Sequence, residues 1–145
     1  MIFREATLED IPFLSAVRLS VKENALSDPR RITPEMYESY LSTKGKGWVC
    51  EVDGKIVGFS VASLDDGSIW ALFVEPGYEG LGIGKELLGR ATAWLFQQGV
   101  HRIVLTTAPG TRADIWYEKQ GWSRGAITSG AEVQYTLTNL SAHPT

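Results

Sequence analysis

The sequence predicts an α/β fold built on one mixed, mostly antiparallel sheet with about four flanking helices, and two observations carry this prediction. An apolar run at residues 69–74 is followed by a glycine-rich loop, an amphipathic stretch and a second apolar run at residues 102–107. A strand–helix–strand unit with a crossover of this length pairs its two strands in parallel. Upstream, a strong Asp-Gly turn signal joins residues 48–52 to residues 55–64, which predicts antiparallel neighbours.

Length and composition predict one domain of ordinary size. A chain of 145 residues buries about two-thirds of its unfolded surface when it folds. With 43% hydrophobic and 21% charged residues, the composition gives no sign of disorder. We expect residues 1–138 to form this domain and residues 139–145 to be a frayed C-terminal tail.

Charge and residue usage argue against several classes of function. The net charge is −3 and there is no basic run, whereas nucleic-acid binding needs a positive footprint. The longest apolar run is far too short to span a membrane, and the N-terminus lacks the features of a signal peptide. Cys50 is the only cysteine, and with two histidines it cannot build a zinc cage. We therefore expect a cytoplasmic protein without a metal, nucleic-acid or membrane partner.

The N-terminal part of the chain predicts an edge strand and a helix. Residues 2–6 read as a short strand. Thr7 is suited to cap a helix that runs towards Asn24. The apolar stripe of this helix consists of Ile11, Leu14, Val17, Leu19 and Val21.

A second helix is predicted after a Ser-Asp-Pro break at residues 27–29. Thr33 supplies the cap residue, and Pro34 takes the first helical position, where its missing amide proton costs nothing. Gly45 and Gly47 are expected to end this helix.

The middle of the chain predicts three antiparallel strands, a helix and a further strand. The three strands are residues 48–52, 55–64 and 69–74. The helix has an apolar stripe at Ile83, Leu87, Leu88, Ala91, Trp94 and Leu95. Gly99 is a natural residue to follow its C-terminus, and residues 102–107 are the strand predicted to lie parallel to 69–74.

The C-terminal part predicts one more helix and a closing hairpin. Thr111 caps the helix, and Asp114 stands at the third helical position as in a capping box. The helix stops at Gly121. Residues 122–127 and 133–137 then read as two antiparallel strands.

The glycine-rich loop after residues 69–74 predicts an anion site. Pro76 ends the strand because it has no amide donor. The loop glycines keep side chains out of the way of a ligand; they are Gly77, Gly80, Gly82 and Gly84. The helix that follows offers unpaired amides and the positive end of its dipole, which together bind phosphate.

Two familiar phosphate motifs do not fit this loop. A dinucleotide fingerprint needs a third glycine where the chain has Lys85. A Walker A loop needs a glycine at Glu79 and a Ser or Thr at Glu86. A nucleotide-binding α/β domain is therefore disfavoured.

The loop instead resembles the coenzyme A pyrophosphate loop of the GCN5-related N-acetyltransferase (GNAT) superfamily. That loop reads Gln/Arg-x-x-Gly-x-Gly/Ala after a strand ending near Val-x-Pro. The residues at the corresponding positions are Val74, Pro76, Glu79, Gly80, Gly82, Ile83 and Gly84. The departure is Glu79, which stands where the family has Gln or Arg.

A second block resembles the final motif of the same superfamily, Asn-x-x-Ala-x-x-Phe/Leu-Tyr-x-x-x-Gly-Phe. Its residues here are Ala113, Trp116, Tyr117, Glu118, Gly121 and Trp122. Gly110 replaces the family's Asn, so a side-chain contact to the pantetheine arm is lost at this position. Together the two blocks and the strand order extend the resemblance from the first predicted strand to the last.

The resemblance implies an N-acetyltransferase that uses acetyl-coenzyme A as cosubstrate and a primary amine as acceptor. Tyr117 takes the position of the general acid, which protonates the leaving thiolate. The implied coenzyme-binding residues are Phe73, Val74, Glu79, Gly80, Leu81, Gly82, Ile83, Gly84 and Lys85. An amide near Phe73 or Val74 would stabilise the developing oxyanion. Because a carboxylate repels phosphate, we expect Glu79 to point towards solvent and Lys85 to supply the positive charge.

The sequence leaves several points open. The predicted central strand holds no carboxylate to deprotonate the amine, so the candidates for the base are Glu23, Glu51, Asp65, Asp66 and a chain of waters. Trp48 and Trp70 suit a pocket, a core or a subunit interface, which leaves a homodimer open. The acceptor amine is not specified, and residues 23–31, which would wall its site, mix acids with two arginines. A non-catalytic coenzyme A-binding sensor is the alternative function.

Overall fold

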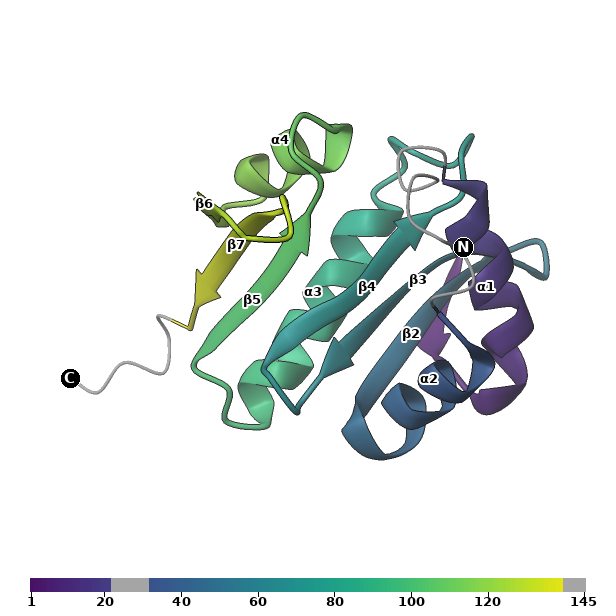
Figure 1. Ribbon diagram of the computed structural model, residues 1–145. Coiled ribbons are helices and arrows are strands. Elements are labelled where there is room, and N and C mark those ends of the chain that lie inside the picture. Colours follow the sequence, from purple (N-terminus) through teal and green to yellow (C-terminus); the bar gives the residue numbers. More distant parts are fainter. Residues whose placement is uncertain (22–31, 140–145) are drawn as a thin grey trace.

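The computed structural model describes residues 1–21 and 32–139 (Figure 1). Over these residues one seven-stranded sheet has the order β1-β2-β3-β4-β5-β7-β6. Neighbouring strands are antiparallel except for the central pair β4 and β5, which is parallel. The mixed, mostly antiparallel sheet and its parallel pair are therefore confirmed.

The described elements follow the predicted order. The strands are β1 (Ile2–Glu5), β2 (Gly45–Val52), β3 (Lys55–Ser63), β4 (Ser68–Val74), β5 (Arg102–Thr107), β6 (Ser123–Ile127) and β7 (Val133–Thr138). The α-helices are α1 (Ile11–Ser20), α2 (Pro34–Ser39), α3 (Ile83–Gln97) and α4 (Arg112–Lys119). A 3-10 turn, η1 (Leu8–Asp10), precedes α1, and a π-helical turn, η4 (Tyr40–Lys44), follows α2.

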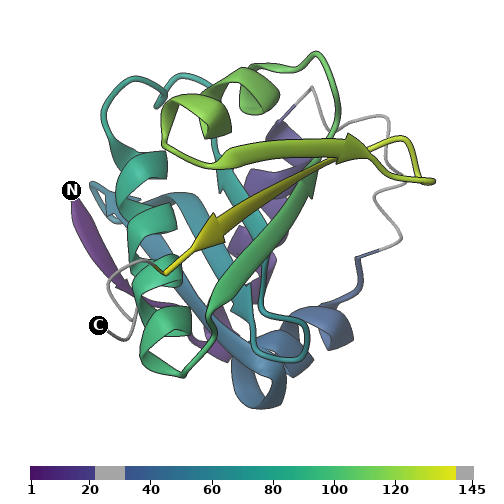
Figure 2. The ribbon, with the colours of Figure 1, turned by 90° about the vertical axis from the view of Figure 1, so that its left-hand side faces the viewer.

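The helices form two layers, one on each face of the sheet (Figures 1 and 2). One face carries α3 and α4, and its core includes Leu87, Ala91 and Leu95 of α3. The other face carries α1 and α2 against β3 and β4, with Leu14 and Phe59 fully buried. These apolar stripes are what fix each helix to its face, because burial of apolar area is the dominant favourable term.

Gly45 and Gly47, expected to end a helix, lie in β2 instead, so that strand starts three residues before the predicted 48–52. The reason is close packing. A Cβ at Gly45 would lie 1.8 Å from the carbonyl oxygen of Ala62 in β3, and one at Gly47 would lie 2.6 Å from Leu41 Cδ2. Only glycine allows the neighbouring strand and η4 to approach so closely.

The N-terminal helix is also shorter than predicted. It begins with η1, and the capping residue Thr7 donates its amide to the carboxylate of Asp10 at 2.7 Å. It ends at Ser20, where Val21 turns to an extended conformation. The predicted continuation to Asn24, the break at residues 27–29 and tail residues 140–145 lie outside the described residues. Within the described part, no helix has the length and apolar character needed to cross a membrane.

Candidate active site

The two parallel central strands separate almost as soon as they meet. β4 pairs with β3 along its length, from Ser68 opposite Ser63 to Val74 opposite Gly58. Its pairing with β5 is confined to Ser68 opposite Val104. The other edge of β5 is fully used by β7. Among the described strands, therefore, the β5-facing backbone edge of β4 is unpaired from residue 69 onwards.

The glycine loop leads from this open strand into α3. The first α3 residue is Ile83, and Gly82 is its N-cap with φ of 82°, a left-handed conformation that disfavours any residue with a Cβ. Apart from its chain neighbours, no described residue has an atom within 4 Å of the position a Cβ on Gly82 would take, so the loop backbone is open on this side. The first amides of α3 have no partner within the helix.

Glu79 is exposed, but its carboxylate is also bound to groups of the protein. Its carboxylate turns back onto the loop and accepts the amide proton of Gly77, with a nitrogen–oxygen distance of 2.5 Å. Its other oxygen lies 3.3 Å from Nη1 of Arg112 at the start of α4. The loop amides of Glu79 and Gly77, followed by Arg112, hold the pKa of Glu79 below its usual range. The physical reason is that loop amides attract a nearby carboxylate as they attract phosphate.

Lys85 is exposed, and it lines a shallow surface hollow along α3 with Gly89, Arg90 and Ala93. The Arg90 guanidinium lies 5.4 Å over the ring of Phe3 in β1. β1 is an edge strand of the sheet, and β5 lies beyond β4 on the other side of α3's contact with β3. Lys85 is five residues from Arg90, about 140° round the helix, so it lies on the exposed face of α3 but not beside the Arg90–Phe3 contact.

Tyr117, the predicted general acid, is buried on α4 among aromatic rings. Its ring packs edge-on against Trp116 and Trp122, and against Tyr135 of β7 at a centroid distance of 5.6 Å. Among the described residues its hydroxyl has no hydrogen-bond partner. Burial raises the pKa of Tyr117, so the phenol stays protonated at neutral pH and keeps a proton to donate.

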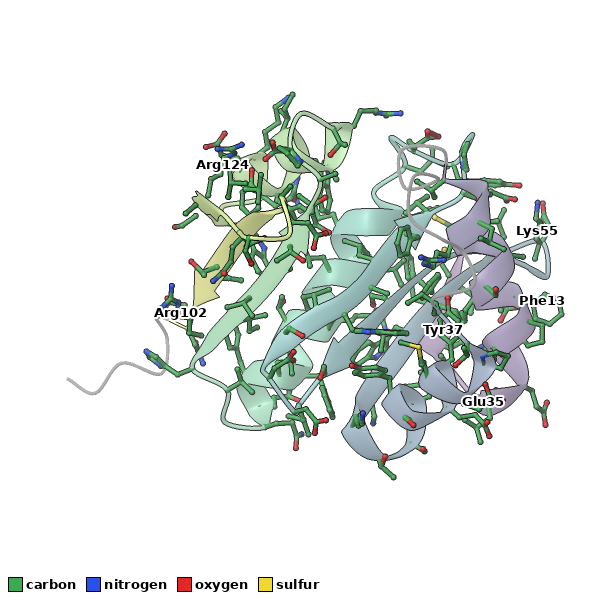
Figure 3. The ribbon with its side chains drawn as sticks, in the orientation of Figure 1. Phe13, Glu35, Tyr37, Lys55, Arg102 and Arg124 are labelled. Atoms are coloured by element: carbon green, nitrogen blue, oxygen red, sulfur yellow. The ribbon has the colours of Figure 1, made fainter. Side chains whose placement is uncertain are left out.

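A polar cluster that the sequence analysis did not foresee anchors the helix of Tyr117. The α4 cap itself is as predicted: the Asp114 amide donates to Thr111 Oγ1 at 3.3 Å. The buried Asp114 carboxylate, in turn, accepts the Gly110 amide at 3.0 Å, the Arg124 guanidinium at 3.0 and 3.1 Å, and the Tyr135 hydroxyl at 2.7 Å. Figure 3 shows Arg124 beside α4, at the outer strand β6.

Two of the candidate bases, Glu51 and Asp66, are hydrogen-bonded to other residues. Glu51 accepts a hydrogen bond of 2.6 Å from the guanidinium of Arg4, a residue of β1. Asp66 accepts the Ser68 hydroxyl at 2.6 Å in the turn before β4, at the end of that strand opposite the glycine loop. Glu23 lies outside the described residues. Sequence reasoning passed over Glu75, which directly follows β4, but its carboxylate is paired with the Lys55 ammonium at 2.9 Å.

The two candidate pocket tryptophans have structural partners. Trp48 is buried and packs edge-on against Trp94 of α3. Trp70 of β4 stacks on Tyr40 at 4.1 Å and meets the ring of Tyr37 edge-on. Trp48 is therefore a core residue, and Trp70 belongs to an aromatic cluster between β4 and α2.

A family model described as the acetyltransferase (GNAT) family matches residues 14–122. The chain belongs to the GNAT acetyltransferase family. The matched residues include both predicted motifs, the glycine loop and the block around Tyr117, and most of the sheet.

Individual relatives share part of the sequence or the whole fold. An uncharacterized N-acetyltransferase ycf52-like protein of Prochlorococcus marinus is 33% identical over 72 residues, 48% of this chain and 39% of its own length. The ribosomal protein bS18-alanine N-acetyltransferase of Haemophilus influenzae is 32% identical over 73 residues, 49% of this chain and 50% of its own length. The matches thus span half or less of these relatives.

Among solved structures, the PaiA N-acetyltransferase of Thermoplasma acidophilum, crystallised with coenzyme A, superposes with a TM-score of 0.78 over 95% of this chain and 98% of its own, at 17% identity. A GNAT-family acetyltransferase of Staphylococcus aureus superposes with a TM-score of 0.79 over 94% of this chain and 98% of its own, at 21% identity. At these identities the superpositions establish the GNAT fold of this chain.

Proposed function

We propose that this protein is an N-acetyltransferase that transfers the acetyl group of acetyl-coenzyme A to a primary amine by direct attack in a ternary complex. The observation that carries the proposal is the separation of β4 from β5 directly beside the glycine loop. An unpaired strand edge and a phosphate-binding helix N-terminus, side by side, suit a ligand that has both an extended amide-containing arm and a pyrophosphate.

The extended arm of coenzyme A fits the open edge of β4. Pantetheine carries two amide groups and pairs with the backbone as an added strand would. At the end of β4, an amide of Phe73 or Val74 then stands opposite the thioester carbonyl. A fixed donor of this kind stabilises the oxyanion that develops as the amine attacks.

The pyrophosphate fits the loop that follows. Its binding residues in this proposal are the backbone groups of Glu79, Gly80, Leu81, Gly82, Ile83, Gly84 and Lys85. The amides and the helix dipole act through the backbone, so the Gln or Arg side chain of the family pattern is not required. The Glu79 carboxylate competes with a phosphate for amides of this loop, because the amides of Gly77 and of Glu79 itself already face it.

Tyr117 donates a proton to the departing thiolate in this mechanism. Two observations support the role: its hydroxyl is without a hydrogen-bond partner among the described residues, and burial raises its pKa. The amine attacks the thioester itself, so no enzyme nucleophile is needed. Cys50 is suited to packing and not to acyl transfer, because it is fully buried in the core and its thiol pKa is raised by burial.

A thermal-shift series tests the coenzyme. Acetyl-coenzyme A and coenzyme A are expected to raise the melting temperature, because a ligand that binds only the native state stabilises it by mass action. NAD and ATP are expected to leave it unchanged. Stabilisation by NAD or ATP alone would contradict the proposal.

Release of free thiol from acetyl-coenzyme A, measured with a panel of amines, then separates the enzyme from a non-catalytic sensor. The sensor is worth testing because the Glu79 carboxylate holds a loop amide in the free protein. Coenzyme binding without thiol release for any amine would favour the sensor. Amine-dependent thiol release supports the transferase.

Gly82→Ala is expected to weaken acetyl-coenzyme A binding by about tenfold or more. The new methyl group would occupy the open space above the loop, and φ of 82° costs a residue with a Cβ roughly 1 kcal/mol in addition. Gly89→Ala in the middle of α3 is the matched control, because the position is helical and has room for a Cβ. This control is expected to stabilise the protein slightly and to keep its affinity. If calorimetry gives the two variants equal affinities for acetyl-coenzyme A, the loop is not part of the coenzyme site.

A further inference from the structure

One ion pair joins the glycine loop to α4. Nη1 of Arg112 lies 3.3 Å from Oε2 of Glu79, and the two residues are 33 positions apart in the chain. Glu79 lies within the loop that follows β4, and Arg112 is the first residue of the helix that follows β5. The pair therefore bridges the gap between the separated strands, beyond the C-terminal ends of β4 and β5 (Figure 1).

The Glu79 carboxylate has the kind of partners that a phosphate has in an anion site. It accepts a loop amide from Gly77 and faces a guanidinium. An Arg guanidinium and a backbone amide are both well suited to bind phosphate oxygens. The side chains are 74% exposed for Arg112 and 38% exposed for Glu79, so the pair is accessible from solvent and weak enough to exchange partners.

Arg90, another exposed arginine among the described residues, does not face this gap. Its guanidinium lies towards β1, 5.4 Å over the ring of Phe3. α4 meets α3 on the opposite side, where a Cβ on Gly84 would lie 3.6 Å from the Trp116 ring. Arg112 reaches the loop from the β5 side, as its contact with Glu79 shows, whereas Arg90 lies on the β1 side of α3.

We propose that Arg112 is a coenzyme-binding residue, which exchanges the Glu79 carboxylate for a phosphate oxygen when the coenzyme binds. The loop carboxylate holds the guanidinium at the mouth of the site in the free protein. The coenzyme phosphates then take over the guanidinium, which also offsets the charge of Glu79. Arg112 thus supplies from α4 the positive charge that position 79 lacks. This inference rests on the proposed coenzyme, and the phosphate concerned is either the pyrophosphate or the 3′-phosphate.

The test is calorimetric titration with acetyl-coenzyme A at low ionic strength. Arg112→Gln is expected to weaken binding about tenfold, the loss typical of one charge-assisted hydrogen bond. Arg112→Lys keeps the charge but loses the planar guanidinium, so its affinity should lie between those of the wild type and Arg112→Gln. Arg90→Gln is the matched control: Arg90 is also exposed and ion-paired, to Glu86 at 2.8 Å, but it lies on the other side of α3. Its affinity should change less than about twofold.

Glu79 variants test the exchange itself. Glu79→Gln should tighten binding by less than about fivefold in the wild-type background, because Arg112 already offsets the carboxylate. In the Arg112→Gln background the same substitution should tighten binding more. Equal effects in both backgrounds, or equal affinities of Arg112→Gln and Arg90→Gln, would overturn the inference.

The choice of ligand separates the possible failures. If the loss in Arg112→Gln persists with 3′-dephospho-coenzyme A, the guanidinium binds the pyrophosphate; if it disappears, the guanidinium binds the 3′-phosphate. Either result supports the inference. Absence of coenzyme binding by the wild-type protein would overturn the proposed function, and with it the inference. Normal binding by wild type and Arg112→Gln alike would overturn the inference alone.

Discussion

Tyr117→Phe is expected to lower turnover by about 10- to 100-fold while leaving acetyl-coenzyme A affinity nearly unchanged. The loss is that of a general acid and corresponds to about 1.4–2.7 kcal/mol of transition-state stabilisation. The affinity is preserved because the phenol acts on the leaving sulfur and only its hydroxyl is removed. The measurement is single-turnover thiol release with a saturating amine, beside calorimetric binding of the coenzyme.

The same variant should not be less stable than wild type. Among the described residues the Tyr117 hydroxyl has no hydrogen-bond partner, so its removal costs no intramolecular bond. Tyr37→Phe is the matched control. Tyr37 is 1% exposed, its hydroxyl also has no partner in the described part of the chain, and it packs on the opposite face of the sheet. Figure 3 shows Tyr37 on α2. Turnover of Tyr117→Phe equal to that of Tyr37→Phe would reduce Tyr117 to a packing residue.

The pH dependence of turnover follows from the burial of Tyr117. Because burial raises its pKa, the phenol stays protonated beyond the ordinary phenol value of about 10. Turnover should therefore show no decline from phenol ionisation up to roughly pH 10. A basic limb near neutral pH that disappears in Tyr117→Phe would contradict the proton state assigned here.

Most of the fold could be predicted because its signals are local. The cap of α4 depends on Thr111 and Asp114, three residues apart, and the structure has that hydrogen bond. The boundaries of β5 follow from one continuous apolar run and agree with the predicted residues 102–107. The parallel pair follows from the length of the crossover.

The errors concern contacts between residues distant in sequence. Gly45 resembles a helix terminator by itself, and its role in β2 depends on the Ala62 carbonyl of the neighbouring strand. The position of the Glu79 carboxylate depends on Arg112, and that of Asp114 on Arg124 and Tyr135, 10 and 21 residues away. Neither arrangement leaves a pattern in the sequence, because side-chain partners across elements follow no spacing rule. A polar residue at a cap position, such as Asp114, is nevertheless a place where a side-chain partner from another element can be expected.

Asp114→Asn is expected to destabilise the protein by about 2–3 kcal/mol, a large share of the 5–15 kcal/mol by which a domain is stable. The Asp114 side chain is 8% exposed, and its carboxylate accepts from Gly110, Arg124 and Tyr135, which belong to the α4 cap, β6 and β7. An amide offers one acceptor oxygen in place of two and leaves the guanidinium partly buried without its counter-charge. Urea unfolding at pH 7 measures the loss.

Asp65→Asn is the control for removing one carboxylate. The Asp65 side chain is 62% exposed and 4.0 Å from Lys44, so this substitution should cost less than about 0.5 kcal/mol. A loss in Asp114→Asn no larger than in Asp65→Asn would mean that the cluster does not hold the α4 cap, β6 and β7 together. The melting temperature of Asp114→Asn should fall by roughly 5–10 °C.

The pH dependence of the same comparison identifies the charge as the cause. Arg124, then the Gly110 amide and the Tyr135 hydroxyl, hold the pKa of the Asp114 carboxyl well below its usual range. A carboxyl whose pKa is lower in the folded state contributes stability above its ordinary value of about 3.9, and that contribution is lost as the pH falls towards the folded pKa. The stability difference between wild type and Asp114→Asn should therefore be largest at neutral pH and shrink below about pH 4. A stability difference that stays constant from pH 7 to pH 2 would assign the loss to packing. A contribution from the carboxylate charge must disappear when the carboxylate is protonated, whereas a packing contribution does not depend on pH.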